Sequence, residues 1–181
     1  VARSENLPLE DESVDLITAC QCFHWFDFEA FFKEARRILK ENGVLAVTGY
    51  SIPTIHIDQQ CTENASLNSN ILFDIYSTTL KPYFEMNRLY YLDSHYKDIE
   101  FPFNDVLRTN MTAKKEITAK DCIDYVKSWS GFESCFQKDR STAEKVITHV
   151  ENTFMAISNE TDLSKIPLVM QTDNILILSR K

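Results

Sequence analysis

Glycine is scarce in this chain, with only Gly43, Gly49 and Gly131 among 181 residues. Average usage of about 7% would supply roughly a dozen. Loops that wrap phosphates or dinucleotides depend on glycine, because the backbone must turn tightly and approach the ligand closely. We therefore expect no loop of that kind within these residues.

Several other features are missing. No apolar run approaches the roughly 18 to 20 residues that cross a bilayer, so we expect no membrane span. The five cysteines include no Cys-x-x-Cys pair of the kind that builds zinc or redox sites. His56, His95 and His149 lack metal-ligand spacing, and we expect no metal. Basic residues are also fewer than acidic ones, 19 against 27. The resulting net charge of -8 opposes binding to nucleic acid or an anionic membrane.

The rest of the composition is average. Apolar residues make up 44% of the chain and charged residues 25%, close to the mix of soluble globular proteins. An odd number of cysteines favours reduced thiols, which are typical of the cytoplasm. We therefore expect a cytoplasmic monomer built around one core.

A strand, a helix and a second strand are predicted near the start of the chain. Residues 14–20 form a short apolar run typical of a buried parallel strand. Asp27 is a good N-cap for the next helix, and Asn42-Gly43 supplies a left-handed stop before a second strand at 44–47. This order predicts a right-handed βαβ unit and an α/β fold. The helix has an apolar stripe (Phe28, Phe31, Phe32, Ala35, Ile38, Leu39) and a charged face (Glu29, Lys33, Arg36, Arg37, Lys40).

The pattern changes in residues 51–140, which hold most of the aromatic residues and no strong strand signal. We expect a helix over about 64–80, and the irregular segment 82–103 indicates a loop with short helical turns. Capping-box patterns at 118–121 and 141–144 predict two later helices.

The sequence closes with two apolar runs, 167–171 and 175–179. The polar residues 172–174 between them predict a tight turn. We therefore expect an antiparallel β-hairpin at this end.

Four motifs follow one another between residues 4 and 47. They are acidic-x-Leu-Pro at 5–8, Asp-Glu-Ser-Val-Asp-Leu at 11–16, Phe-His-Trp-Phe at 23–26 and Glu-Ala-x-Arg-x-Leu-Lys-x-x-Gly at 34–43. In this order and spacing they resemble the central motifs of class I S-adenosylmethionine-dependent methyltransferases, with a methyltransferase type 11 domain. More narrowly, they are similar to the branch that includes trans-aconitate methyltransferase.

The resemblance implies a three-layer, Rossmann-like methyltransferase fold with a mostly parallel sheet and the antiparallel hairpin at its end. Family members open with strands and a glycine-rich loop that this sequence lacks, so the resemblance implies a C-terminal fragment. Residues 1–181 would form a single partial domain. Within it, 1–50 would be the central βαβ part of the cofactor-binding core, 51–140 a helical substrate lid, and 141–181 the C-terminal helix and hairpin.

The resemblance also implies S-adenosyl-L-methionine as cofactor. Ser4 and Glu5 fall where the family contacts adenine, and Cys20 and Gln21 where it contacts the methionyl part. Ligands of such sheets bind at the carboxyl ends of the strands, which agrees with the position of Cys20. The alternatives are an ordinary polar loop at Ser4 and Glu5 and a small buried side chain at Cys20.

His24 follows in the loop that faces the methyl acceptor in this family. An imidazole there could position or deprotonate the acceptor, since its reference pKa lies near neutrality. The alternative is a structural histidine that caps the next helix.

The substrate-binding residues implied by the resemblance are Trp25, Tyr83, Arg88, Tyr96, Trp129 and Ser130. Methyl transfer relies on alignment and exclusion of water, and a carboxylate acceptor would need only a cationic clamp. Arg88 is the candidate clamp because an arginine fork binds a carboxylate bidentately. The alternatives are a surface arginine and aromatic side chains that simply pack together.

Three hypotheses for function follow. The first is methyl transfer from S-adenosylmethionine to a small metabolite that is polar or carries a carboxylate. The second is a truncated methyltransferase remnant without catalysis. The third is a dinucleotide-dependent oxidoreductase, which the His-Trp loop and the expected hairpin fit less well.

Overall fold

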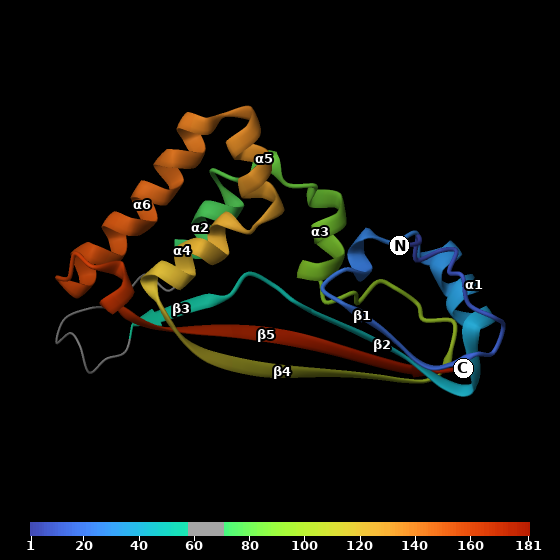
Figure 1. Ribbon diagram of the computed structural model, residues 1–181. Coiled ribbons are helices and arrows are strands. Elements are labelled where there is room, and N and C mark those ends of the chain that lie inside the picture. Colours follow the sequence, from blue (N-terminus) through green and yellow to red (C-terminus); the bar gives the residue numbers. More distant parts are fainter. Residues whose placement is uncertain (58–70) are drawn as a thin grey trace. The chain divides into compact units, whose positions relative to one another are not determined.

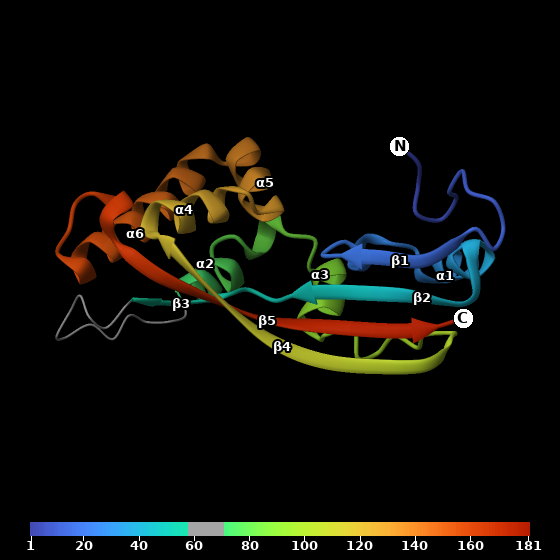
Figure 2. The ribbon, with the colours of Figure 1, turned by 60° about the horizontal axis from the view of Figure 1, so that its bottom comes forward.

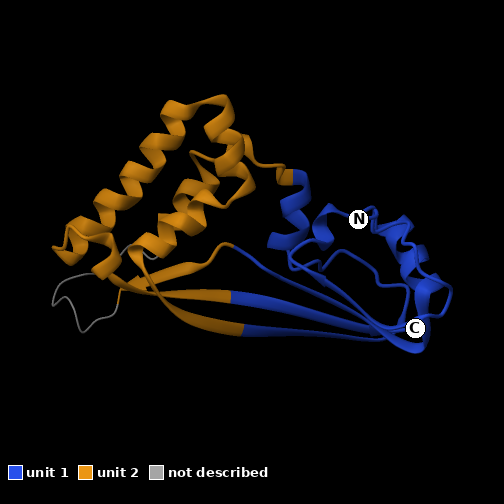
Figure 3. Cartoon of the chain, viewed as in Figure 1, with its two compact units in different colours: residues 1–51, 87–111, 173–181 blue, residues 52–86, 112–172 orange. Residues whose placement is uncertain are grey.

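The computed structural model describes residues 1–57 and 71–181. They form two compact units, each assembled from separate stretches of the chain (Figure 3). The first unit consists of Val1–Ser51, Asn87–Met111 and Asp173–Lys181, and the second of Ile52–Met86 and Thr112–Thr172.

The first unit contains the predicted strand, helix and strand, which are β1 (Val14–Cys20), α1 (Phe28–Ile38) and β2 (Leu39–Tyr50) (Figure 1). The two strands pair in parallel, as expected. The Asp27 carboxylate accepts from the Ala30 backbone N–H at 3.1 Å and so caps α1. Asn42 is left-handed, with φ 64°, but the helix already ends at Ile38.

The terminal hairpin is not formed, because residues 167–180 make one continuous strand, β5 (Pro167–Arg180). A tight hairpin turn needs a residue with positive φ, and residues 172–174 contain neither a glycine nor such a residue. In the first unit β5 pairs antiparallel with β2, from Val44 opposite Arg180 to Tyr50 opposite Asn174. The antiparallel orientation was thus predictable, but the partner was not.

A further partner of β5 is β4 (Asn104–Thr118), which lies where a helical segment was expected. Within the first unit, β1, β2, β5 and β4 lie side by side in that order (Figure 2). Nearly all of β4 is exposed, so its sequence carries no alternation of apolar and polar residues to reveal a strand. A second short strand, β3 (Thr54–Ile57), also falls in this region.

The second unit is mainly helical. Its helices are α2 (Ile71–Ser77), α4 (Ala119–Lys127), α5 (Ser130–Lys138) and α6 (Arg140–Ser158), with short 3-10 turns at Lys81–Tyr83 and Leu163–Lys165. In this unit β3 pairs antiparallel with the first part of β5. The described part of the helix expected over 64–80 begins at Ile71, and its earlier residues lie outside the described ones.

Helix capping in this unit differs from the prediction at one of two places. The box of Thr118 and Asp121 is present at α4. At α6, however, the cap is Asp139, whose carboxylate accepts from the Thr142 backbone N–H at 3.1 Å, so the helix starts ahead of the predicted box. None of the described helices is long and apolar enough to cross a membrane.

An aromatic cluster fills the core of the first unit. Phe23 lies in the short turn Phe23–Trp25 and is fully buried. Its ring centroid lies within 6.0 Å of the rings of Phe26, Phe28, Phe31, Phe32, Tyr96 and Phe101. The apolar stripe of α1 and the aromatic residues that follow α3 (Met86–Asp93) thus share one core.

Gly131 in α5 offers a test of packing in the second unit. A Cβ there would lie 2.5 Å from two carbons of the Phe84 ring. We expect Gly131→Ala to lower the free energy of unfolding by about 1–3 kcal/mol through overpacking, even though alanine is the better helix former. Urea unfolding measures this change, with Ser134→Ala on the same helix as control. A more stable Gly131→Ala variant would contradict the packing.

Candidate functional site

A hollow of about 610 Å³ lies in the first unit. It is formed by the N-terminal segment, the turn before α1, the first turn of α1, and α3. The lining residues are Arg3, Ser4, Glu5, Trp25, Phe26, Asp27, Ala30 and Arg88. Four of the residues predicted from the sequence, two for cofactor and two for substrate, are therefore brought together here.

The N-terminal segment is fixed to α1 by hydrogen bonds. Glu5 Oε1 accepts from the Asp27 backbone N–H at 3.2 Å, which places the Glu5 side chain at the start of the helix. Farther along, Glu34 Oε1 accepts from the Leu7 backbone N–H at 2.7 Å. Arg37 donates to the carbonyl oxygens of Leu7 and Leu9. The segment that carries Ser4 and Glu5 is therefore held in place by the helix.

Arg37 forms ion pairs with two carboxylates in this support, those of Glu34 and Asp11. Arg37 Nη2 lies 2.7 Å from Glu34 Oε1, and Arg37 Nη1 lies 2.7 Å from an Asp11 carboxylate oxygen. The hydrogen bonds from Arg37 and from the Leu7 backbone lower the pKa of Glu34 to about 2. Arg37 was predicted only as part of the charged face of the helix, so sequence reasoning missed its contacts with the N-terminal segment.

Arg88 and Trp25 give the hollow its exposed functional groups. Arg88 is exposed on α3, and its one hydrogen bond to the described residues is from Nη1 to the Phe26 carbonyl oxygen at 3.3 Å. Most of its donors are therefore available to a ligand. Trp25 is 41% exposed, so part of its indole ring is accessible.

His24 and Tyr96 form an enclosed pair, and the His24 ring centroid lies 5.2 Å from that of Trp25, which lines the hollow. His24 is 3% exposed, Tyr96 is fully buried, and the His24 Nδ1 atom lies 3.2 Å from the Tyr96 hydroxyl oxygen. Burial, helped by the charge of Arg88, lowers the pKa of His24 to about 4. The imidazole is therefore neutral at pH 7 and a weak base. It does not cap α1 either, because Asp27 does.

Cys20 and Gln21 end β1 but do not line the hollow. Gln21 is left-handed, with φ 53°. Its side-chain amide accepts from the Tyr50 backbone N–H at 2.9 Å and donates to the Tyr50 carbonyl oxygen at 3.0 Å. Gln21 thus ties the ends of β1 and β2 together. Cys20 is exposed, which contradicts the alternative of a buried small residue.

The remaining substrate candidates belong to the second unit. The Tyr83 hydroxyl lies 3.5 Å from an Asp139 carboxylate oxygen, and Ser130 is the first residue of α5. Trp129 is 8% exposed, and its indole Nε1 has no hydrogen-bond partner among the described residues. Its ring packs with those of Tyr76, Phe84 and Tyr125.

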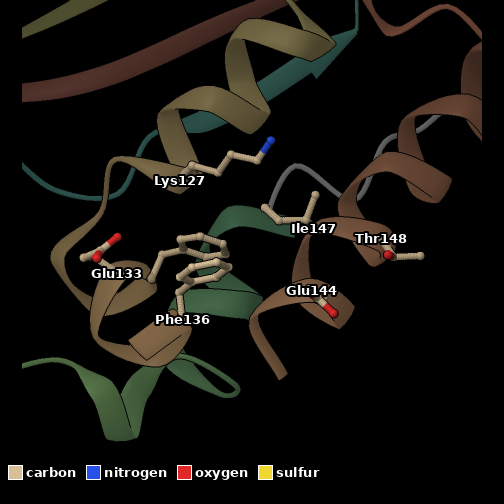
Figure 4. Close-up of a pocket in the computed structure, with 7 residues that line it drawn as sticks. Lys127, Glu133, Phe136, Glu144, Ile147 and Thr148 are labelled. Carbon is tan, nitrogen blue, oxygen red and sulfur yellow. The ribbon is translucent and has the colours of Figure 1, made fainter. Parts of the chain in front are cut away.

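The second unit also has a hollow, of about 430 Å³, that sequence reasoning did not predict. Figure 4 shows Lys127 reaching toward it from α4, Phe136 from α5 and Ile147 from α6. Phe132, Glu133, Glu144 and Thr148 complete its lining. Phe132 and Phe136 stack with their ring centroids 6.4 Å apart, so its floor is apolar.

The buried, neutral His24 predicts a loss of stability in mild acid. Its pKa is about 4 in the folded protein and about 6.5 in an unfolded chain, so the unfolded state takes up the proton first as pH falls. We expect the free energy of unfolding to decrease by up to about 3 kcal/mol from pH 6.5 to 4. Urea unfolding of the wild type and of His24→Gln measures this, and an equal pH dependence in both would contradict it.

Comparisons with known proteins agree with the fold. Residues 1–47 match the family model described as a methyltransferase domain. A Dictyostelium discoideum protein described as a methyltransferase is 28% identical over all 181 residues, which correspond to 65% of its length. An uncharacterized Schizosaccharomyces pombe methyltransferase is 61% identical over 41 residues, 23% of this chain and 16% of that protein. The structure of a type II methyltransferase from Anaeromyxobacter dehalogenans matches 99% of this chain and 69% of that one, with a TM-score of 0.74 and 20% identity.

These matches confirm two predictions. The chain has a Rossmann-like α/β methyltransferase fold, and it resembles the class I S-adenosylmethionine-dependent methyltransferases. The chain spans 65% of the length of its Dictyostelium relative. The trans-aconitate branch stays a prediction, and none of these matches supports the oxidoreductase hypothesis.

Proposed function

We propose that this chain, which has a methyltransferase fold, acts in the transfer of a methyl group from S-adenosyl-L-methionine to a small carboxylate-bearing metabolite. The observation that carries the proposal is the hollow of the first unit. It collects Ser4 and Glu5, expected to contact the cofactor, with Trp25 and Arg88, expected to contact the acceptor. Residues 1–47, which match the methyltransferase family, supply most of its lining.

The lining of this hollow suits the adenosine part of the cofactor. Ser4 and Glu5 offer polar groups for the ribose hydroxyls and the ring nitrogens of adenine. We propose that Ser4 and Glu5 hold this part, and that Cys20 and Gln21, at the carboxyl end of β1, lie near the methionyl part. When bound, the cofactor supplies a methyl group on a positively charged sulfur.

Arg88 supports a carboxylate as the acceptor. Its guanidinium is exposed at the hollow and has donors to spare for two parallel hydrogen bonds to a carboxylate. A carboxylate is ionised at neutral pH, so no side chain has to remove a proton from it. Transfer forms an oxygen–methyl bond, breaks the sulfur–methyl bond and leaves the electron pair on sulfur, with no proton released. This matches the neutral state of His24.

The other substrate candidates keep a proposed role in enclosing the acceptor. Tyr83, Trp129 and Ser130 lie in the second unit, for which we propose the role of a lid. Exclusion of water by such a lid would favour transfer over hydrolysis.

A methyl-transfer assay tests the proposed function. The protein is incubated with methyl-labelled S-adenosylmethionine and, separately, with carboxylic acids, amines and phenols of similar size. We expect label in base-labile methyl esters of one or more of the acids. Label on amines or phenols alone would contradict a carboxylate acceptor.

A non-catalytic remnant is the second candidate, and the outer edge of the sheet is the feature that weighs against it. Among the described residues β1 pairs with β2 alone, and Leu16 on β1 is 56% exposed. Natural proteins usually cover or shorten such an edge. A folded protein that binds no cofactor would support this candidate over the enzyme.

A further inference from the structure

In the hydrogen bond between His24 and Tyr96, the packing around the hydroxyl decides which of the two side chains is the donor. The Tyr96 hydroxyl is fully enclosed, and its side-chain hydrogen-bond partner among the described residues is His24 Nδ1, at 3.2 Å, while the backbone of His24 also hydrogen-bonds to it. A buried hydroxyl group nearly always donates a hydrogen bond, because a buried donor without a partner costs about 1–3 kcal/mol. The hydroxyl of Tyr96 therefore donates, and Nδ1 of His24 accepts.

The protonation states agree with this direction. Burial raises the pKa of Tyr96, so the phenol keeps its proton. Burial and the charge of Arg88 keep the imidazole of His24 neutral. A neutral imidazole has one N–H group, and an Nδ1 that accepts leaves that hydrogen on Nε2. The titratable groups that act on this pair are Arg88 and Cys22; Arg88 has no acceptor atom, and the sulfur of Cys22 is only a weak acceptor compared with the imidazole nitrogen.

Tyr96 is held rigidly in place for this contact. It follows His95, and both residues are left-handed with φ 54°, a conformation that costs non-glycine residues about 1 kcal/mol or more. Arg108 stabilises the turn, since its guanidinium donates to the carbonyl oxygen of Tyr96 at 3.1 Å and to that of Ile99 at 2.8 Å. The same guanidinium lies over the Phe101 ring. The position of Tyr96 is thus set by contacts other than the one to His24.

The second nitrogen of His24 remains open to a ligand. Among the described residues, the fully enclosed side-chain nitrogen and oxygen atoms without a partner are Trp129 Nε1 and Ser179 Oγ. His24 Nε2 is not one of them, although it has no hydrogen bond to these residues. His24 does not line the hollow itself, but its ring centroid lies 5.2 Å from that of Trp25, which does. An Nε2–H group would therefore have no partner within the described residues and would lie next to a residue of the hollow.

We propose that Tyr96 is a positioning residue that fixes His24 as the Nε2–H tautomer, so that His24 donates a hydrogen bond to the methyl acceptor. The acceptor part of this inference rests on the proposed function. The Nε2–H group would add a third hydrogen bond to the carboxylate that the Arg88 fork binds, and the attacking oxygen would keep a lone pair for transfer. His24 thus orients the acceptor and does not deprotonate it, which restricts the acceptors to groups that are already ionised.

Nitrogen-15 NMR of the whole protein, labelled at histidine, tests the tautomer. Signals of His24 are assigned by their loss in His24→Gln. We expect a pyridine-type shift at Nδ1 and a pyrrole-type shift at Nε2, both constant from about pH 5.5 to 8. A pyrrole-type Nδ1, or a titration near the ordinary pKa of about 6.5, overturns the proposal.

Tyr96→Phe tests the positioning role, because it removes the hydroxyl and keeps the ring in the core. We expect the His24 shifts to move toward a mixture of tautomers, whereas Tyr90→Phe, on the exposed tyrosine that donates to Asp98, leaves them unchanged. Unchanged shifts in Tyr96→Phe overturn the proposal. If that variant does not fold, the wild-type shifts decide the tautomer alone.

Kinetics separate this inference from the proposed function. We expect Tyr96→Phe to raise the KM for a carboxylate acceptor about tenfold, the worth of one hydrogen bond, with cofactor affinity unchanged. An unchanged KM overturns the acceptor part. No transfer by the wild type would overturn the proposed function, while the NMR result still decides the tautomer.

Discussion

Arg88→Ala is expected to lower kcat/KM for a carboxylate acceptor about 100-fold, with little change in cofactor affinity. Arg88 lines the hollow and makes one long hydrogen bond within the described residues, so most of its N–H donors are available to a ligand. Hydrogen bonds to charged groups are worth about 1.5–3 kcal/mol, which at the upper end corresponds to about 100-fold. Steady-state kinetics and cofactor titration measure the two effects separately.

Two further variants sharpen this prediction. Arg88→Lys keeps the charge and loses the fork, so its kcat/KM should fall between those of the wild type and Arg88→Ala. Arg140→Ala in the second unit removes an arginine whose side chain is 72% exposed and should have little effect. Equal losses in Arg88→Ala and Arg140→Ala would mean that the effect is one of general charge and not of a clamp.

Phe23→Ala is expected to have the largest effect on stability, about 3–5 kcal/mol. Phe23 is fully buried, and six aromatic rings surround it, including Tyr96 and Phe101 from a distant part of the sequence. Alanine would leave a cavity that these rigid rings cannot readily fill. Thermal unfolding should show a midpoint lower by roughly 10 °C or more.

The matched control is Phe73→Ala, at a phenylalanine that is 53% exposed on α2. Its loss should cost well under half as much, because little apolar surface leaves the core. Similar costs for the two variants would contradict the central place of Phe23 in the first unit.

Local signals in the sequence were enough to predict the βαβ part of the fold. The apolar run of β1, the Asp27 cap and the apolar stripe of α1 each depend on neighbouring residues only. The pairing of β4 with β5 is different. It joins segments far apart in the chain, and the exposed β4 has no apolar pattern to show it. The polar residues 172–174 indicated a turn, although strand pairing extends them into β5.

The sequence predicted which residues belong to the candidate site better than it predicted the contacts they make. Family motifs point to Ser4, Glu5 and Trp25, and the structure brings them into one hollow with Arg88. The contact of Arg88 with the Phe26 carbonyl spans 62 residues, so no local pattern shows it. Likewise the burial of His24, which makes it a poor base, depends on packing with Tyr96.

Titration of the folded protein with S-adenosyl-L-methionine by calorimetry tests the central claim most directly. We predict saturable binding at one site below about 1 mM, the upper end of usual KM values, together with a rise in the unfolding temperature. Arg88→Ala should bind the cofactor equally well, because Arg88 is assigned to the acceptor. A protein that is folded by circular dichroism and gives no binding heat or thermal shift at about 1 mM cofactor would contradict the proposed enzyme.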